Sequence, residues 1–182
     1  MEEREIRDHK LKILVMLSFY NDYNLDELLE NYFINLPYED EDYENEYTGD
    51  LSKKYFDVYK KDGHLNYNII DNDKKKVICI DYLYDKIKDF LKNFYDREKE
   101  ILDILTENVK GWNINRMPKC EKYILMIAVY EMYFDESIKD VNIPINEAVL
   151  LAKVYGMDDR ADKFINGILG TIYKSNENID SN

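Results

Sequence analysis

The stretch Val141-Asn-Ile-Pro-Ile-Asn-Glu-Ala-Val-Leu-Leu-Ala-Lys-Val-Tyr-Gly156, followed by Lys163-Phe-Ile-Asn-Gly-Ile-Leu169, decides the fold of this chain. It predicts two helices joined by a tight turn. Pro144 disfavours helical geometry in the residue before it, so the first helix is expected to begin after the proline, with Asn146 as its N-cap. Small and apolar residues then recur at helical spacing on one face, at Ala148, Leu151, Ala152 and Tyr155.

The turn between these helices has its own signals. Gly156 is the expected residue after the first helix, because glycine readily adopts the left-handed conformation that closes a helix. Asp158 or Asp159 is expected to cap the second helix. The apolar face of the second helix comprises Ala161, Phe164, Ile165, Ile168, Leu169 and Ile172. The two helices together predict a helical hairpin with a close interhelical contact.

Composition limits the class of protein. Only 6 of the 182 residues are Gly and 3 are Pro, whereas 45% are hydrophobic, which favours helices over a turn-rich β fold. No apolar run is long enough to span a membrane, and the charged N-terminus has no signal-peptide core. The net charge of −13 argues against non-specific binding of nucleic acid, so any RNA contact requires a local basic patch.

The two cysteines, Cys79 and Cys120, belong to no CxxC motif and to no Cys/His cluster. Isolated cysteines of this kind are expected to be reduced thiols in a cytoplasmic protein. The sequence therefore predicts no metal site and no cofactor.

Helical spacing predicts five further helices before the deciding stretch. Three of them are expected at about residues 4–20, 25–34 and 73–95. A fourth is expected to be capped by Asp96 and ended by Gly111, and a fifth to open at Pro118. All seven belong to one helical domain over residues 1–174.

Two segments depart from this pattern. Residues 38–50 contain seven acids and no base, so 38–70 is predicted to be an inserted, exposed and mobile acidic loop, with one short amphipathic stretch near Lys53–Tyr59. Residues 175–182 are predicted to form a disordered tail. One hypothesis for the insertion is that its negative charge screens an RNA-binding surface, and deletion of 38–70 would test it.

The last third of the chain resembles the NusB family. The family pattern contains Trp-x-x-x-Arg, then a helix ending in Tyr-Glu-Leu, then Ile-Asn-Glu-Ala-Val-x-Leu-Ala-Lys-x-Tyr/Phe-Gly, and finally Lys-Phe-Val-Asn-Gly-Val-Leu. The matching residues here are Trp112 and Arg116, Ile124–Met132, Ile145–Lys153, Tyr155-Gly156 and Lys163–Leu169. The match covers residues 112–172 well, whereas 4–35 and 73–110 agree with the family only in helix pattern.

The resemblance implies an all-α fold of two small helical bundles packed nearly at right angles. Family members bind the boxA element of ribosomal RNA leader transcripts together with NusE, a ribosomal protein, and help the RNA polymerase elongation complex to read through terminators. The resemblance therefore implies an RNA-binding transcription antitermination factor that acts in the cytoplasm.

The family's RNA surface centres on an arginine-rich start of the first helix. The resemblance carries this role to basic and aromatic residues of the chain, and Tyr155 would offer a face for stacking an unpaired base. The expected RNA-binding residues are Arg4, Arg7, Lys10, Lys12, Lys153, Tyr155 and Lys163. Arg4, Arg7, Lys153 and Lys163 are expected on one continuous face. Glu121 and Phe164 correspond to partner-facing positions, and Glu131 is expected to be a polar anchor of the fold.

Departures from the family pattern leave a second reading open. An arginine of the family pattern is Met126 here, and acids dilute the basic patch of the first helix. The alternative is therefore a NusB-like module that works through protein contacts with lost or weakened RNA binding. A third possibility, the domain that precedes an RNA cytosine methyltransferase, is disfavoured because no catalytic domain follows.

Catalysis has little support in the sequence. There is no glycine-rich phosphate loop, no GxSxG and no HExxH motif, and the chain has only two histidines. The abundant acid pairs are expected on exposed helices without any function. The sequence therefore predicts a protein that is not an enzyme.

Overall fold

The computed structural model describes residues 3–35, 43–44, 51–52, 55–61, 64–71, 74–109 and 113–177, with side chains at most of the helical positions. The chain divides into two compact units, one made of residues 1–6 and 20–90 and the other of residues 7–19 and 91–182. The described helices are α1 (Glu3–Leu17), α2 (Leu25–Asn35), α3 (Ile80–Asp96), α4 (Glu98–Asn108), α5 (Lys119–Tyr133), α6 (Asn142–Tyr155) and α7 (Ala161–Glu177), together with a 3-10 turn at Ile114–Arg116.

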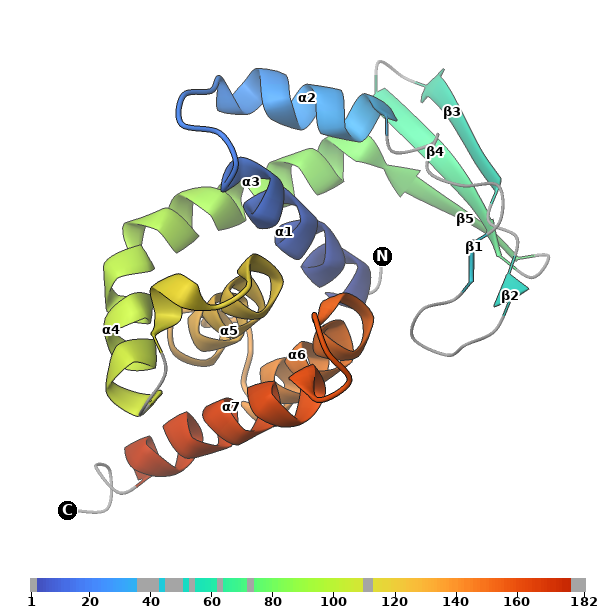
Figure 1. The fold of residues 1–182 in the computed structure, drawn as a ribbon. Coiled ribbons are helices and arrows are strands. Elements are labelled where there is room, and N and C mark those ends of the chain that lie inside the picture. Colours follow the sequence, from blue (N-terminus) through green and yellow to red (C-terminus); the bar gives the residue numbers. More distant parts are fainter. Residues whose placement is uncertain are drawn as a thin grey trace. The chain divides into compact units, whose positions relative to one another are not determined.

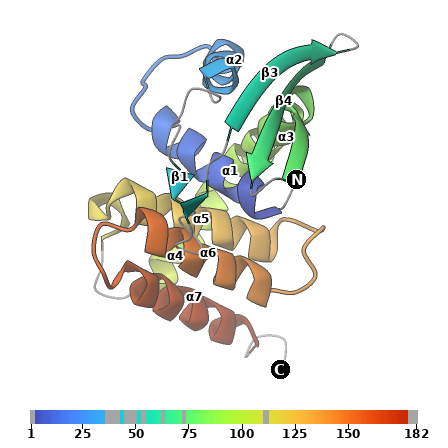
Figure 2. The same cartoon turned by 90° about the vertical axis from the view of Figure 1, so that its right-hand side faces the viewer.

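The second unit is helical. Helices α6 and α7 lie side by side, and α5 packs against both (Figures 1 and 2). Helix α5 is the central element, because every residue from Ile124 to Glu131 is buried. A helix that is buried on all faces is apolar all round, and α5 fits this rule with a single charged residue in that run, Glu131. The N-cap of α5 is Pro118, which confirms the predicted start of this helix.

Helix α6 begins four residues earlier than the cap predicted at Asn146. It starts at Asn142, so Pro144 lies in its first turn, where the missing proline N–H costs no intrahelical bond. The N-cap residue is Val141, and the side chain of the residue before it, Asp140, accepts the backbone N–H of Asn142 at 2.9 Å to Oδ1. This hydrogen bond from the Asn142 backbone lowers the pKa of Asp140. The prediction of Asn146 as N-cap was therefore wrong, because a proline is tolerated at the start of a helix.

Gly156 ends α6 as predicted, but for a different physical reason. Its φ is −66° and its ψ 145°, so the backbone is extended and not left-handed. A Cβ atom at this position would overlap the carbonyl oxygen of Ala152 and the Cβ of Ala161. Glycine is therefore required by the close approach of the ends of α6 and α7. Helix α7 starts after Asp158, whose Oδ1 accepts the Arg160 N–H at 2.6 Å.

The first unit contains α2 and most of α3. Asn24 caps α2, because its side-chain oxygen accepts the N–H groups of Asp26 and Glu27. Asp26 in turn accepts hydrogen bonds from Lys88 Nζ at 2.5 Å and from the Tyr84 hydroxyl at 2.9 Å. These contacts link α2 to α3. The Lys88 hydrogen bond, followed by that of Tyr84, lowers the pKa of Asp26.

A sheet lies between α2 and α3 in the chain, where the sequence predicted a loop over 38–70 and a helix from residue 73. Strands β3 (Tyr55–Lys61), β4 (His64–Asp71) and β5 (Lys74–Cys79) form an antiparallel sheet in the order β3-β4-β5, seen best in Figure 2. Two further short strands, β1 (Tyr43–Glu44) and β2 (Leu51–Ser52), pair with each other.

The register explains how this sheet forms. Lys61 pairs with His64 and Asp71 with Lys74, so each connection has two residues, the length of a tight hairpin. The residues at the first connection are Asp62-Gly63, one of the strongest hairpin signals in a sequence. The helix predicted from residue 73 was wrong over 74–79, and α3 starts at Ile80, directly after β5.

The predicted all-α class with seven helices is confirmed for the helical framework, and the sheet is an addition within the first unit. Helix α1 ends at Leu17 rather than at residue 20, and α7 extends to Glu177, so the predicted tail at 175–182 begins too early. The predictions for Gly111, for Trp112 and for most of the acidic residues in 38–50 concern positions outside the described residues. The right-angle packing of two bundles stays a prediction.

Candidate functional site

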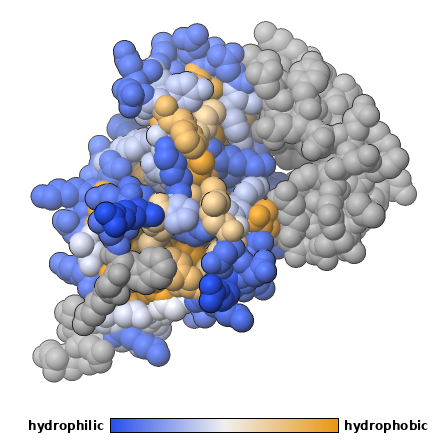
Figure 3. Space-filling model, in the orientation of Figure 1, coloured by the Kyte–Doolittle hydropathy of each residue, from blue (hydrophilic) through white to orange (hydrophobic). Residues whose placement is uncertain are grey.

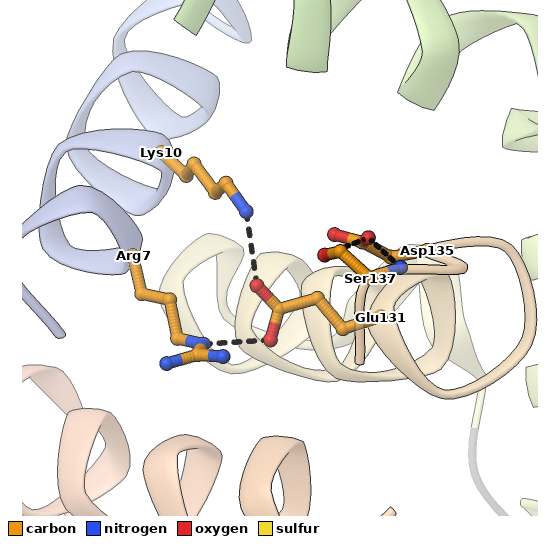
Figure 4. A network of polar contacts seen from close by, with 5 residues as sticks. All are labelled: Arg7, Lys10, Glu131, Asp135 and Ser137. Carbon is orange, nitrogen blue, oxygen red and sulfur yellow. Dashed lines mark hydrogen bonds and ion pairs between the residues drawn. The ribbon is translucent and has the colours of Figure 1, made fainter. Parts of the chain in front are cut away.

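A buried ion cluster joins α1 to α5 in the second unit. Arg7 Nε donates to Glu131 Oε2 at 2.7 Å, and Lys10 Nζ donates to Glu131 Oε1 at 2.9 Å (Figure 4). Arg7, Lys10 and Glu131 retain only 4%, 7% and 2% of their accessible surface. Each carboxylate oxygen thus has its own cation. The predicted role of Glu131 as a polar anchor agrees with these contacts.

This cluster changes the environment expected for two of the RNA-binding candidates. A cation that is paired inside a protein cannot leave its partner without a large desolvation penalty. Arg7 and Lys10 therefore do not present their charges to solvent, and Arg7 does not belong to the continuous basic face that the sequence predicted. The sequence around Arg7 gives no sign of this pairing, because Glu131 lies 124 residues away.

A second cluster, at the edge of the same unit, contains two other candidates. Asp8 on α1 accepts a hydrogen bond from the Tyr155 hydroxyl of α6, at 2.6 Å to Oδ1. Its other oxygen, Oδ2, lies 3.2 Å from Lys12 Nζ, one helical turn along α1. The side chains of Lys12 and Asp8 are 33% and 17% exposed, so this pair meets solvent. An exposed pair at this spacing stabilises a helix by only about 0.3–0.5 kcal/mol. We call Asp8, Lys12 and Tyr155 the Asp8 cluster.

The remaining candidates are placed separately. Lys153 on α6 and Lys163 on α7 are both exposed. Arg4, at the start of α1, is half-buried and belongs to the first unit. Of the seven RNA-binding candidates, the structure therefore brings Lys12 and Tyr155 together through Asp8, and encloses Arg7 and Lys10 in a separate cluster.

The partner-binding candidate Glu121 lies in the first turn of α5. Its Oε1 accepts the backbone N–H of Met157 at 2.7 Å, which ties the α6–α7 turn to α5. Its Oε2 is buried, and within the described part of the chain no group donates a hydrogen bond to it. Met157 itself is 75% exposed. The other candidate, Phe164 on α7, is half-buried.

One contact near this helix end has no signal in the sequence. Lys119 Nζ lies 3.6 Å from the ring centroid of Phe19 and donates to the Ser18 carbonyl at 2.8 Å. This ties the end of α1 to the start of α5, across a separation of 101 residues. Cys120 next to it is a half-buried free thiol, and burial, with the charge of Glu121 as a smaller cause, raises its pKa.

In the view of Figure 3, hydrophilic residues surround a band of hydrophobic residues on the described surface. Among the described helices, none combines the length and apolar character that a membrane span requires. Within the same residues, no three His, Cys, Asp or Glu side chains gather closely enough to hold a metal ion.

Comparison with known proteins agrees with the resemblance in the sequence. The pattern of the NusB family matches residues 5–174. The transcription antitermination protein NusB of Finegoldia magna is 35% identical over 136 residues, which cover 75% of this chain and 88% of that protein. The NusB of an Exiguobacterium species is 43% identical over 76 residues, which cover 42% of this chain and 58% of that protein. The solved structure of T. maritima NusB aligns with a TM-score of 0.63 and 21% identity, over 96% of this chain and 92% of that one, and so shares the fold.

Proposed function

Because this chain belongs to the NusB family of transcription antitermination proteins, which are not enzymes, we propose that it binds boxA-type RNA of ribosomal RNA leaders together with NusE. It would act in the cytoplasm, on the RNA polymerase elongation complex. The observation that carries this proposal is the Asp8 cluster. There a lysine that can contact a phosphate and a tyrosine ring that can stack on an unpaired base lie on neighbouring helices.

The unit that holds this cluster contains further cations that support the proposal. The exposed side chains of Lys153 and Lys163 belong to the same unit and can add phosphate contacts. Because Arg7 and Lys10 pair with Glu131 inside the fold, RNA binding would depend on fewer residues, namely Lys12, Tyr155, Lys153 and Lys163. We therefore expect weak binding of RNA by the chain alone and tighter binding when NusE supplies further contacts.

For the protein partner we propose the surface around Glu121, with Met157 and Phe164. A buried carboxylate oxygen without a donor carries an uncompensated desolvation cost. If the Glu121 side chain turns outward when NusE docks, a hydrogen-bond donor of NusE would remove that cost. The exposed Met157 side chain adds apolar contact area at the same turn.

The direct test is a titration of fluorescently labelled boxA RNA, measured by anisotropy, with and without NusE and at two salt concentrations. We expect NusE to tighten binding, a scrambled RNA to bind more weakly, and affinity to fall as salt rises. If the chain does not bind boxA RNA even with NusE present, the proposal is wrong.

That outcome would favour the alternative function, a NusB-like protein-interaction module with lost or weakened RNA binding. The observation on its side is the enclosure of Arg7 and Lys10 with Glu131, which removes two cations from the surface. Calorimetric titration of NusE into the chain without RNA would then show binding. The same titration would show no heat of binding if both the RNA-binding function and the protein-interaction function are wrong.

Single lysine substitutions locate the RNA surface. We expect Lys153→Ala to weaken binding and to reduce the slope of log affinity against log salt by about 0.7, the value for one phosphate contact on a single strand. Lys163→Ala is expected to act in the same way. Lys99→Ala is the matched control, because Lys99 is exposed on α4 outside the proposed surface. An equal change in all three variants would mean that only net charge matters.

A further inference from the structure

The carboxylate of Asp8 contacts the side chains of Tyr155 and Lys12, which both belong to the proposed RNA surface. One oxygen accepts the Tyr155 hydroxyl at 2.6 Å, and the other lies 3.2 Å from the Lys12 ammonium. Asp8 therefore places a negative charge at the position where Lys12 would meet a phosphate. It also holds the tip of the Tyr155 side chain against α1.

The two charged clusters of α1 differ in how easily their cations can change partner. Arg7 and Lys10 are enclosed with Glu131, and their exchange to an RNA phosphate would leave that carboxylate buried without a cation. The Asp8–Lys12 pair is partly exposed to solvent, and such a pair is weak and screened by salt. Lys12 is thus a cation of α1 that can exchange Asp8 for a phosphate.

We propose that Asp8 is an affinity-determining residue, which competes with RNA phosphate for Lys12 and so lowers the affinity of the chain for boxA-type RNA. This inference rests on the proposed RNA-binding function and deepens it. RNA binding by the Asp8 cluster then involves an exchange. The Lys12 ammonium leaves the Asp8 carboxylate and contacts a phosphate, while Asp8 keeps the Tyr155 hydroxyl.

The test is Asp8→Asn, which removes the charge and keeps an oxygen that can accept the Tyr155 hydroxyl. In the presence of NusE we expect this variant to bind boxA RNA more tightly than the wild type. Its salt slope should be steeper, because in the wild type the Asp8 carboxylate that Lys12 leaves takes up a cation from solution on binding, whereas asparagine takes up none. Its advantage over the wild type should therefore shrink as the salt concentration rises.

Three further variants separate this effect from simpler ones. Asp103→Asn removes the same charge from an exposed position on α4 and should leave both affinity and slope nearly unchanged. In a Lys12→Ala background, Asp8→Asn should give little gain, because the group that it releases is absent. Tyr155→Phe keeps the ring and the Asp8 charge, so it should not reproduce the gain of Asp8→Asn. Thermal unfolding followed by circular dichroism verifies that each variant is folded.

The outcomes distinguish the inference from the function beneath it. If the wild type binds boxA RNA but Asp8→Asn behaves like Asp103→Asn, the inference is wrong and the function stands. The inference is also wrong if Tyr155→Phe gives the same gain, since ring mobility and not charge would then set the affinity. If neither the wild type nor Asp8→Asn binds the RNA with NusE, the inference about Asp8 and the proposed RNA-binding function are both wrong.

Discussion

Glu131→Gln is expected to lower the free energy of unfolding by about 3–5 kcal/mol, the cost of leaving a buried cation without its charge partner. The glutamine keeps the shape of the side chain but removes the charge that both Arg7 and Lys10 contact, at 2.7 and 2.9 Å. Urea unfolding followed by circular dichroism at two wavelengths measures the change.

The control for this prediction is Glu100→Gln. Glu100 pairs with Arg97 at 2.7 Å, but both side chains are 51% exposed, so the expected loss is below about 1 kcal/mol. Similar losses of unfolding free energy in the two variants would show that the ion pairs of Glu131 are no stronger than an exposed pair. A triple variant, Arg7→Met, Lys10→Met and Glu131→Leu, should recover most of the stability, because apolar groups remove the desolvation penalty altogether.

Gly156→Ala is expected to destabilise the second unit by about 1–3 kcal/mol or more. The added methyl group would overlap the Ala152 carbonyl oxygen and the Ala161 Cβ, so the backbone between α6 and α7 would have to move. Because the Met157 N–H contacts Glu121 beside this turn, the movement should also weaken that hydrogen bond. Urea unfolding gives the loss of stability, and NusE binding reports on the turn.

Gly167 offers a matched control on α7. A Cβ atom there would meet no other atom within 4 Å, so Gly167→Ala has no steric cost. The substitution is expected to raise the free energy of unfolding by about 0.5–1 kcal/mol, since alanine loses less conformational freedom than glycine in a helix. If Gly156→Ala is tolerated as well as Gly167→Ala, the α6–α7 contact is looser than the structure indicates.

The helices could be predicted where their signals are local. Pro118 marks the start of α5, and the apolar spacing that defines α7 continues through Asn166-Gly167 without a break. The start of α6 was predicted five residues too late, because its N-cap is Val141 and the side chain that accepts its first N–H is Asp140, outside the stretch that carries the apolar pattern. A local rule therefore located the helix and misplaced its boundary.

The sheet and the charged clusters were harder to predict, for two different reasons. Val77 continues the helical spacing of α3, and so the strand pattern of 74–79 was read as helix although Asp62-Gly63 signalled a hairpin nearby. Glu131, which pairs with Arg7, lies 124 residues from it, and Tyr155, one of the partners of Asp8, lies 147 residues from Asp8. No local pattern tells a cation that binds RNA from one that binds Glu131, since the difference lies in burial, which only the fold determines.

The direct passage from β5 into α3 limits how the inserted segment can be removed. No residue separates Cys79 from Ile80, so the sheet ends where the helix begins. A deletion of residues 38–70 would remove β3 and nearly all of β4, and would leave β5 as a single strand without a neighbour. An unpaired strand is a template for intermolecular association, so such a variant would report aggregation instead of the role of the acidic residues. A clean excision has to extend to residue 79, which makes the hairpins and the acidic segment one exchangeable cassette.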